Sequence, residues 1–246
     1  GRSDDVPAAG VFDGPPAPIP PAVVTRDERG RVTVRAVRLD RPLQIDGRLD
    51  ETIYQTSMPI EDLVQQVPKE GAPASESTQA WVFFDDNNLY FSGRCLDSHP
   101  EKIVANELRH DSNNIFTGGD SLTLVLDTFY DHRNGFLFQT NPLGALREQA
   151  IADGQYIESW NTVWDVKSVI PFKSLRYRES GAQIWGINFR RVIRWKNEFA
   201  GVVPIPAAFG PSGLAQMQVA ATLVGLTTPV RSRNLELNPY AVAATT

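Results

Sequence analysis

Polar side chains that could bind a ligand recur in three strand-like segments of the sequence. Every second residue of a strand points to the same side of a sheet, so these groups would share one face if their strands are neighbours. Such a face could hydrogen-bond a ligand, or it could be an ordinary solvated sheet surface, and both interpretations stay open. The candidate ligand-binding residues are Thr123, Gln139, Asn141, Asn188 and Arg190.

Two tryptophans are candidates for stacking against a ligand. Trp160 precedes Trp164, and we expect Trp164 in the core and Trp160 to be the more exposed of the two. Trp195 follows a strand-like segment and is next to Lys196, which suits a rim aromatic or a simple strand-end anchor. An aromatic face together with hydrogen-bonding groups is the combination that binds a sugar ring.

Three aspartates in turn-rich sequence form a candidate calcium site. A hard cation such as calcium requires several oxygen ligands that converge from loops. The spacing of these residues fits no fixed calcium motif, so no cofactor is assigned with certainty. The candidate metal ligands are Asp127, Asp131 and Asp153.

Several functional classes are disfavoured by composition and motifs. The net charge of −5 gives no basic field for nucleic acid, so no nucleic-acid partner is expected. The single cysteine, Cys95, excludes an intrachain disulfide and a cysteine-based zinc site, and its strand-like context predicts a small buried thiol. The three histidines are expected at the surface. No catalytic fingerprint is present, and no carboxylate pair stands out, so we predict a non-catalytic chain.

The sequence divides into three regions. Residues 1–30 are rich in proline and alanine and are expected to form an extended arm or linker. Residues 31–228 contain about ten short strand-like segments with turn signals and no long helical pattern, which predicts an all-β, antiparallel β-sandwich of jelly-roll type. Residues 229–246 are expected to be a linker and the start of a following element.

Two features bear on targeting. No run of about 18 apolar residues occurs, so no transmembrane helix is expected in this chain. The chain starts Gly-Arg-Ser-Asp-Asp without a methionine or a signal peptide, which we interpret as a processed or trimmed terminus.

An ordered set of short motifs resembles a known family. The set includes Ile-Asp-Gly-Arg-Leu-Asp-Glu (Ile45–Glu51), the run Asp120–Gly144 and Ile-Pro-Phe-Lys-Ser-Leu-Arg (Ile170–Arg176). In this order they resemble the family-9 carbohydrate-binding-module-like domain, as found at the N-terminus of bacterial outer-membrane proteins. The C-terminal half of those proteins is a domain of unknown function, thought to be a β-barrel.

The sequence departs from this family at the positions that would bind sugar. Where relatives have a clamping tryptophan this chain has Phe116-Thr117, and the carboxylate and basic positions fall at Thr123 and Gln139. Relatives carry a hairpin at the position that follows Lys167. Either the protein has lost this hairpin, or the present sequence omits it. The region from Val166 to Val169 has no turn residues for it.

The resemblance implies a non-catalytic carbohydrate-binding module of an exported protein in the periplasm, outer membrane or cell surface. Its partners would be a glycan and its own C-terminal barrel or another outer-membrane protein. The alternative is a structural or protein-interaction domain that docks on the barrel or a partner and has lost sugar binding. Structural calcium is common in related sandwiches.

Overall fold

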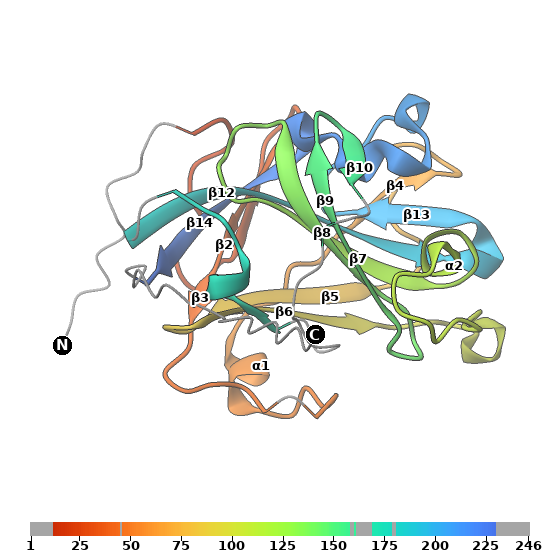
Figure 1. Cartoon of the computed structure of the whole chain (residues 1–246), viewed down its shortest axis with the longest axis horizontal. Coiled ribbons are helices and arrows are strands. Elements are labelled where there is room, and N and C mark those ends of the chain that lie inside the picture. The colour runs from red at the N-terminus through yellow and green to blue at the C-terminus, as the bar shows by residue number, and fades with distance from the viewer. Residues whose placement is uncertain (1–11, 45, 158–159, 161–168, 179–180, 230–246) are drawn as a thin grey trace, which may run out of the picture.

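The computed structural model describes residues 12–44, 46–157, 160, 169–178 and 181–229, without the side chains of residues 116–117. Strands dominate these ranges, and the two α-helices are each five residues long. No helix in the described part of the chain is long and apolar enough to cross a membrane. The strands form two sheets that pack face to face, so the predicted all-β sandwich is confirmed (Figure 1).

Ten of the described strands form a large sheet. Eight of them lie in the order β1-β2-β14-β12-β7-β8-β9-β10, and β13 pairs with both β12 and β4. The strand bounds are β1 (Val24–Arg26), β2 (Val32–Arg35), β4 (Val64–Val67), β7 (Ser121–Asp127), β8 (Asn134–Thr140), β9 (Leu146–Ala152), β10 (Gln155–Ile157), β12 (Gly181–Ile193), β13 (Glu198–Gly201) and β14 (Ala221–Thr228).

The small sheet has four described strands in the order β11-β6-β5-β3. Their bounds are β3 (Val37–Arg38), β5 (Thr78–Phe84), β6 (Asn88–Cys95) and β11 (Val169–Pro171). The α-helices are α1 (Thr52–Thr56) and α2 (Asn113–Thr117), and short 3-10 turns span Pro100–Lys102, Phe172–Ser174, Arg194–Lys196, Ala207–Phe209, Pro211–Ala215 and Met217–Val219.

The core lies between the two sheets and follows from the alternation along their central strands. Phe91 of β6 and Phe189 of β12 meet across the interface with ring centroids 5.2 Å apart. Leu124 of β7 and Phe138 of β8 are buried in the same cluster. Neighbouring residues on these large-sheet strands must therefore point to its other face.

Most strand pairs are antiparallel, but two are parallel. β14 pairs with β2 and β3 pairs with β5 in the parallel sense, which the prediction of an antiparallel sandwich did not include. Both pairs join strands that are far apart in the sequence. A parallel pair needs a long crossover rather than a tight turn, so local turn signals cannot reveal it.

The hairpin β5–β6 forms as expected, whereas the prediction for its cysteine was wrong. Asp85 accepts backbone hydrogen bonds from Asn87 and Asn88, which closes the turn between the strands. Cys95 is exposed at the end of β6 rather than buried. At this end β6 projects beyond the core, and residues 93–95 are all exposed.

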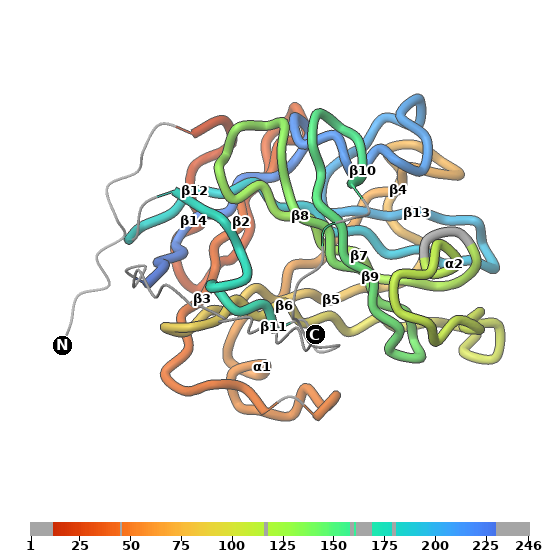
Figure 2. The backbone as a smooth tube through the Cα atoms, in the orientation of Figure 1, coloured from red at the N-terminus to blue at the C-terminus, as the bar shows by residue number. Residues whose placement is uncertain are grey.

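Two segments without long strands cover the large sheet. Residues 202–219, which connect β13 to β14, lie on the face of the large sheet away from the small sheet. Figure 2 shows this segment in blue beside β9 and β10. In the predicted arm, Thr33 Oγ1 donates to the carbonyl of Pro15 at 2.6 Å, and Val24–Arg26 form β1. The predicted element 229–246 lies almost entirely outside the described residues, as does the predicted missing hairpin after Lys167.

Candidate functional site

The strand register brings four polar residues into one row across the large sheet. Arg190 of β12 pairs with Thr123 of β7, which pairs with Gln139 of β8, which pairs with Arg147 of β9. One step along, Asn188 and Gln149 occupy the outer positions of the next row. Since their strand neighbours Leu124, Phe138 and Phe189 face the core, these side chains lie on the opposite face. We call these residues the polar layer: Thr123, Gln139, Arg147, Gln149, Asn188 and Arg190.

The polar layer is buried, so it is not the ordinary solvated sheet surface that the sequence left open as one interpretation. Thr123 and Gln139 are 0% exposed, and Asn188 and Arg190 are 1% exposed. The segment 202–219 covers this face, and its Pro211 carbonyl accepts a 2.6 Å hydrogen bond from Arg190 Nη1. Short 3-10 turns gave no periodic signal, which is why the sequence did not predict this cover.

Side-chain hydrogen bonds connect the layer from strand to strand. Arg147 Nη1 donates to Gln139 Oε1 at 3.2 Å, and Gln139 Nε2 donates to Ser121 Oγ at 3.2 Å. The Arg190 guanidinium lies over the ring of Phe199, 4.8 Å from its centroid. Burial lowers the pKa of Arg190 to about 10, so it stays cationic at neutral pH.

Three oxygen atoms of the layer lack a hydrogen-bond donor among the described residues. They are Thr123 Oγ1, Gln149 Oε1 and Asn188 Oδ1, and each is fully buried. A buried polar atom without a partner costs about 1–3 kcal/mol, so native proteins supply one from water, an ion or a ligand. The layer therefore offers acceptors to a hydroxyl-bearing molecule.

Sequence reasoning found four members of the layer and missed two, Arg147 and Gln149. The signal was present: the turn Asn141–Gly144 joins β8 to β9 as a hairpin, which sets Arg147 opposite Gln139. Asn141, also predicted for the site, lies outside the layer. Its Oδ1 accepts from the backbone of Leu143 and Ala145, and its Nδ2 donates to the Glu107 carbonyl at 2.7 Å. The first two contacts close the turn, and the third ties it to the loop at Glu107.

The two candidate tryptophans also lie away from the layer. Trp160 packs on Phe136 and Phe138, with centroids 4.7 and 6.0 Å apart, and Phe138 faces the core. Trp195 follows β12 and has the ammonium groups of Lys102 and Lys196 at 4.5 and 4.8 Å from its ring. Neither contact places an aromatic face against the polar layer.

The candidate calcium ligands already accept hydrogen bonds within turns. Asp127 accepts from the backbone N–H groups of Phe129, Asp131 and His132, and burial nonetheless raises its pKa. Asp131 accepts from the backbone of Arg133 and Asn134, and Asp153 pairs with Arg133 at 2.7 Å. Each of the three carboxylates thus accepts hydrogen bonds from backbone N–H groups or from an arginine. Calcium binding at these residues stays a prediction.

A different group brings potential metal ligands together. Among the described residues, His110, Asp111 and Glu148 have ligand atoms within 4.8 Å of one another. His110 Nδ1 lies 2.9 Å from Asp111 Oδ2, and its Nε2 lies 3.3 Å from Glu148 Oε2. The two ring nitrogens point in different directions, so the imidazole bridges the carboxylates.

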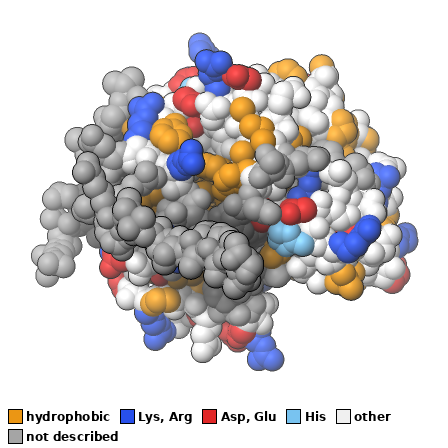
Figure 3. All heavy atoms as spheres, viewed as in Figure 1, with side chains coloured by type: hydrophobic (Ala, Val, Ile, Leu, Met, Phe, Trp, Pro, Cys, Tyr) orange, Lys and Arg blue, Asp and Glu red, His pale blue; other side chains and the backbone are white. Residues whose placement is uncertain are grey.

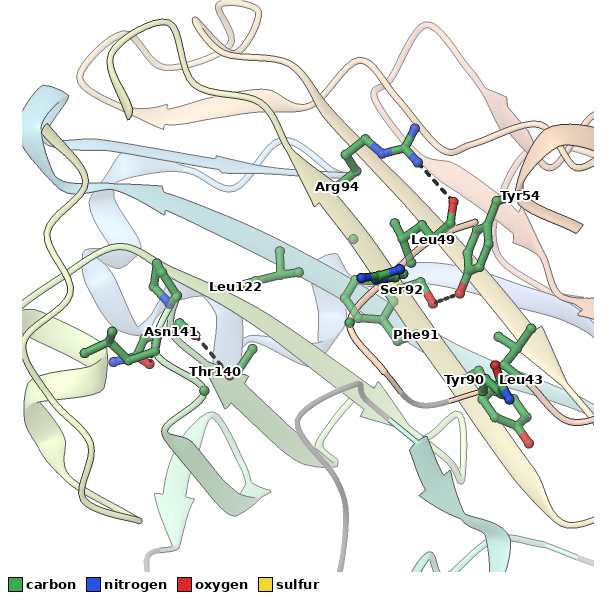
Figure 4. Close-up of a pocket in the computed structure, with 17 residues that line it drawn as sticks. Leu43, Leu49, Tyr54, Tyr90, Phe91, Ser92, Arg94, Leu122, Thr140 and Asn141 are labelled. Carbon is green, nitrogen blue, oxygen red and sulfur yellow. Dashed lines mark hydrogen bonds between the residues drawn. The ribbon is translucent and has the colours of Figure 1, made fainter. Parts of the chain in front are cut away.

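An open groove lies at the other sheet, along Tyr90–Arg94 of β6. It encloses about 630 Å³ between the loop that precedes α1 and the turn that follows β8. Figure 4 shows Arg94, Leu49 and Tyr54 on one side of β6, and Leu122, Thr140 and Asn141 on the other. Tyr54 OH and Ser92 Oγ lie 2.7 Å apart inside it. On the molecular face shown in Figure 3, charged and apolar side chains are interspersed.

No model of a known protein family and no curated protein matches this chain. Solved structures resemble it in shape at low sequence identity. A family-9 carbohydrate-binding module from Caldicellulosiruptor kristjanssonii in complex with cellotriose is 14% identical, with 84% of this chain and 100% of that chain covered and a TM-score of 0.49. The structure of a family-9 module from the same organism in complex with glucose is 13% identical, has the same coverage and has a TM-score of 0.48.

A protein from Bacteroides uniformis is 12% identical, with 78% of this chain and 98% of that chain covered and a TM-score of 0.49. At this level of similarity the ligands of these proteins do not transfer to the present chain.

Proposed function

We propose that this chain is a non-catalytic carbohydrate-binding module whose ligand contacts the polar layer. The observation that carries the proposal is the set of three buried acceptor oxygens, on Thr123, Gln149 and Asn188, that lack described donors. Sugar hydroxyl groups donate and accept hydrogen bonds at once, so the rings of an oligosaccharide can supply donors to these acceptors, which lie on β7, β9 and β12, and can also accept from neighbouring donors. The resemblance of the ordered sequence motifs to the family-9 module-like domain supports the same ligand class.

Access to the layer requires movement of the segment 202–219. Side-chain contacts hold its middle part, among them Arg190 Nη1 to the Pro211 carbonyl at 2.6 Å and Gln66 Nε2 to the Gly210 carbonyl at 2.7 Å. Both involve the carbonyls of a turn, and Phe209 beside them is 40% exposed. We propose that a ligand displaces this turn and takes over the Arg190 contact.

The cellular context is also a proposal. The motif resemblance supports an exported protein of the periplasm, outer membrane or cell surface that carries an outer-membrane β-barrel after this domain. Fractionation of the cells that produce the full-length protein, with an antibody to this domain, tests it. Recovery in the outer-membrane fraction supports the proposal, and recovery with the cytoplasm contradicts it.

Saturation-transfer NMR with a panel of neutral monosaccharides and oligosaccharides, with and without calcium, tests sugar binding. We expect transfer to at least one sugar at millimolar concentration. The variant Gln149→Leu has a similar volume and removes one acceptor oxygen, so it should weaken that signal. No transfer to any sugar in either condition would contradict the proposal.

A further inference from the structure

The groove along β6 has a basic wall and no acidic residue among its described lining. Arg48 and Arg94 both line it, although the whole chain carries 29 acidic residues and a net charge of −5. Among the described residues neither arginine forms an ion pair, and both are exposed. Arg94 instead makes hydrogen bonds of 3.4 Å to the Leu49 carbonyl and 3.3 Å to Gln79 Oε1. The groove is therefore suited to an anionic ligand.

The floor of the groove is a strand edge. β11 pairs with β6 only at Asn88, Leu89 and Tyr90, so no described strand continues along Phe91–Cys95 on that side. Two hydrogen bonds close the ends of the β5–β6 ladder, from Asp85 N to the Asn88 carbonyl and from Leu96 N to the Ser77 carbonyl. They fix which residues of β6 turn their backbone N–H and C=O groups towards β5 and which turn them away. With that alternation, the backbone N–H and C=O groups of Phe91, Gly93 and Cys95 point away from β5, and Phe91 and Gly93 line the groove.

The two walls of the groove differ in chemistry. Arg94 lies on one side of the groove and Leu122 on the other (Figure 4). Arg48 comes from the loop beside Leu49, and Pro142 and Leu143 come from the turn after β8, so we assign them to the basic and the apolar wall respectively. Leu143 is 48% exposed. Successive side chains of an extended peptide point to opposite sides, so one that pairs with the edge would send alternate residues to the two walls.

We propose that the β6 edge binds an extended segment of a partner protein in which acidic and apolar residues alternate. The partner backbone pairs with Phe91, Gly93 and Cys95. Its acidic side chains face Arg48 and Arg94, and its apolar side chains face Leu122, Pro142 and Leu143. Five residues of β6 span about 16 Å, which accommodates a peptide of five or six residues. This surface is separate from the polar layer and does not depend on sugar binding.

Fluorescence anisotropy with three labelled hexapeptides tests the proposal. The first is Val-Glu-Val-Glu-Val-Glu, the second has the same composition in the order Val-Val-Val-Glu-Glu-Glu, and the third is Val-Lys-Val-Lys-Val-Lys. We expect the first to bind at least about tenfold more tightly than the other two, with affinity that falls as salt is raised. Equal binding of all three, or no binding of the first, would overturn the proposal.

Two variants locate the site. Arg94→Glu reverses the charge of the basic wall and should weaken binding of the acidic peptide about tenfold or more, whereas Arg29→Gln, at an exposed arginine outside the groove, should leave it unchanged. Gly93→Pro removes an edge N–H that does not bond to β5, and Gly93→Ala keeps it. The added Cβ of the alanine would meet only the end of the Leu122 side chain. Loss of binding in the proline variant alone supports edge pairing.

Two further outcomes would overturn the proposal. One is slow hydrogen exchange of the Phe91 and Gly93 amides in the free protein, because it would mean that the chain already pairs with this edge. The other is binding of tetragalacturonic acid, an acidic glycan, with the same Arg94→Glu sensitivity but without peptide binding. That result would assign the groove to anionic sugars.

Discussion

Thr123→Val should stabilise the free protein while it weakens ligand binding. Thr123 is 0% exposed, and its Oγ1 has no hydrogen-bond partner among the described residues. A buried hydroxyl in that state costs about 1–3 kcal/mol, and valine replaces it with a methyl group of nearly the same shape. We therefore expect the free energy of unfolding to rise by about 1 kcal/mol, which corresponds to about 2–4 °C in Tm for a chain of this size.

A second strand threonine provides a matched control for this change. Thr33 of β2 is also 0% exposed, but its Oγ1 donates to the Pro15 carbonyl at 2.6 Å. Thr33→Val removes that bond and leaves the carbonyl without its donor, so it should lower the free energy of unfolding by about 1–2 kcal/mol. The two variants have the same chemistry and burial, and their opposite signs isolate the missing partner of Thr123.

Urea unfolding followed by circular dichroism, with both variants and the wild type, measures these differences. The reasoning is refuted if Thr123→Val destabilises the protein as much as Thr33→Val does. That result would show that the Thr123 hydroxyl is hydrogen-bonded in the free protein, by an ordered water or otherwise. Thr123 Oγ1 would then already have a hydrogen-bond partner and would not need one from a ligand.

Two further predictions concern pH and packing. Burial tends to raise the pKa of Glu76, but hydrogen bonds from Lys196 and Ser98 outweigh the effect of burial. The pKa of Glu76 is therefore lowered from 4.5 to about 2. The stabilisation is thus present above pH 4.5 and lost as the pH falls towards 2. Lys196→Met should lower the free energy of unfolding by about 1 kcal/mol at pH 7, after allowance for solvent screening, and by less at pH 2.5; an equal loss at both would contradict this. In Gly135→Ala the new Cβ would lie 2.8 Å from the Leu126 carbonyl oxygen and 2.9 Å from Met217 Sδ. The free energy of unfolding, measured by thermal unfolding, should therefore fall by about 1–3 kcal/mol. Gly93→Ala is the control and should be nearly neutral.

The sequence predicted the central strands because their signals are local. Apolar and polar residues alternate in the sequence of β5, β7 and β12, and turn residues separate the partners of the hairpins. The same alternation correctly set Thr123, Gln139, Asn188 and Arg190 on one face. What it could not predict was that this face is buried, because the cover is a run of 3-10 turns between β13 and β14 without periodicity.

The tryptophan predictions show the same limit. Trp160 was a candidate for stacking against a ligand, but its position depends on long-range contacts with Phe136 and Phe138, two strands away in the fold. Its exposure relative to Trp164 stays a prediction, because Trp164 lies outside the described residues. The groove along β6 also depends on segments far apart in sequence, the loop before α1 and the turn after β8. No spacing in the sequence relates them, since only the packing of the two sheets brings them together.

The most direct test of sugar binding at the polar layer is calorimetric titration of the wild type and two variants with the sugars that give NMR transfer. Asn188→Ala removes a buried acceptor oxygen that lacks a described donor, and Gln218→Ala changes an exposed residue of the covering segment. We predict saturable binding by the wild type, an affinity at least about tenfold lower for Asn188→Ala, and no change for Gln218→Ala. Wild-type affinity in Asn188→Ala, or no heat of binding from any protein at millimolar sugar, would contradict the assignment of this layer as a sugar site.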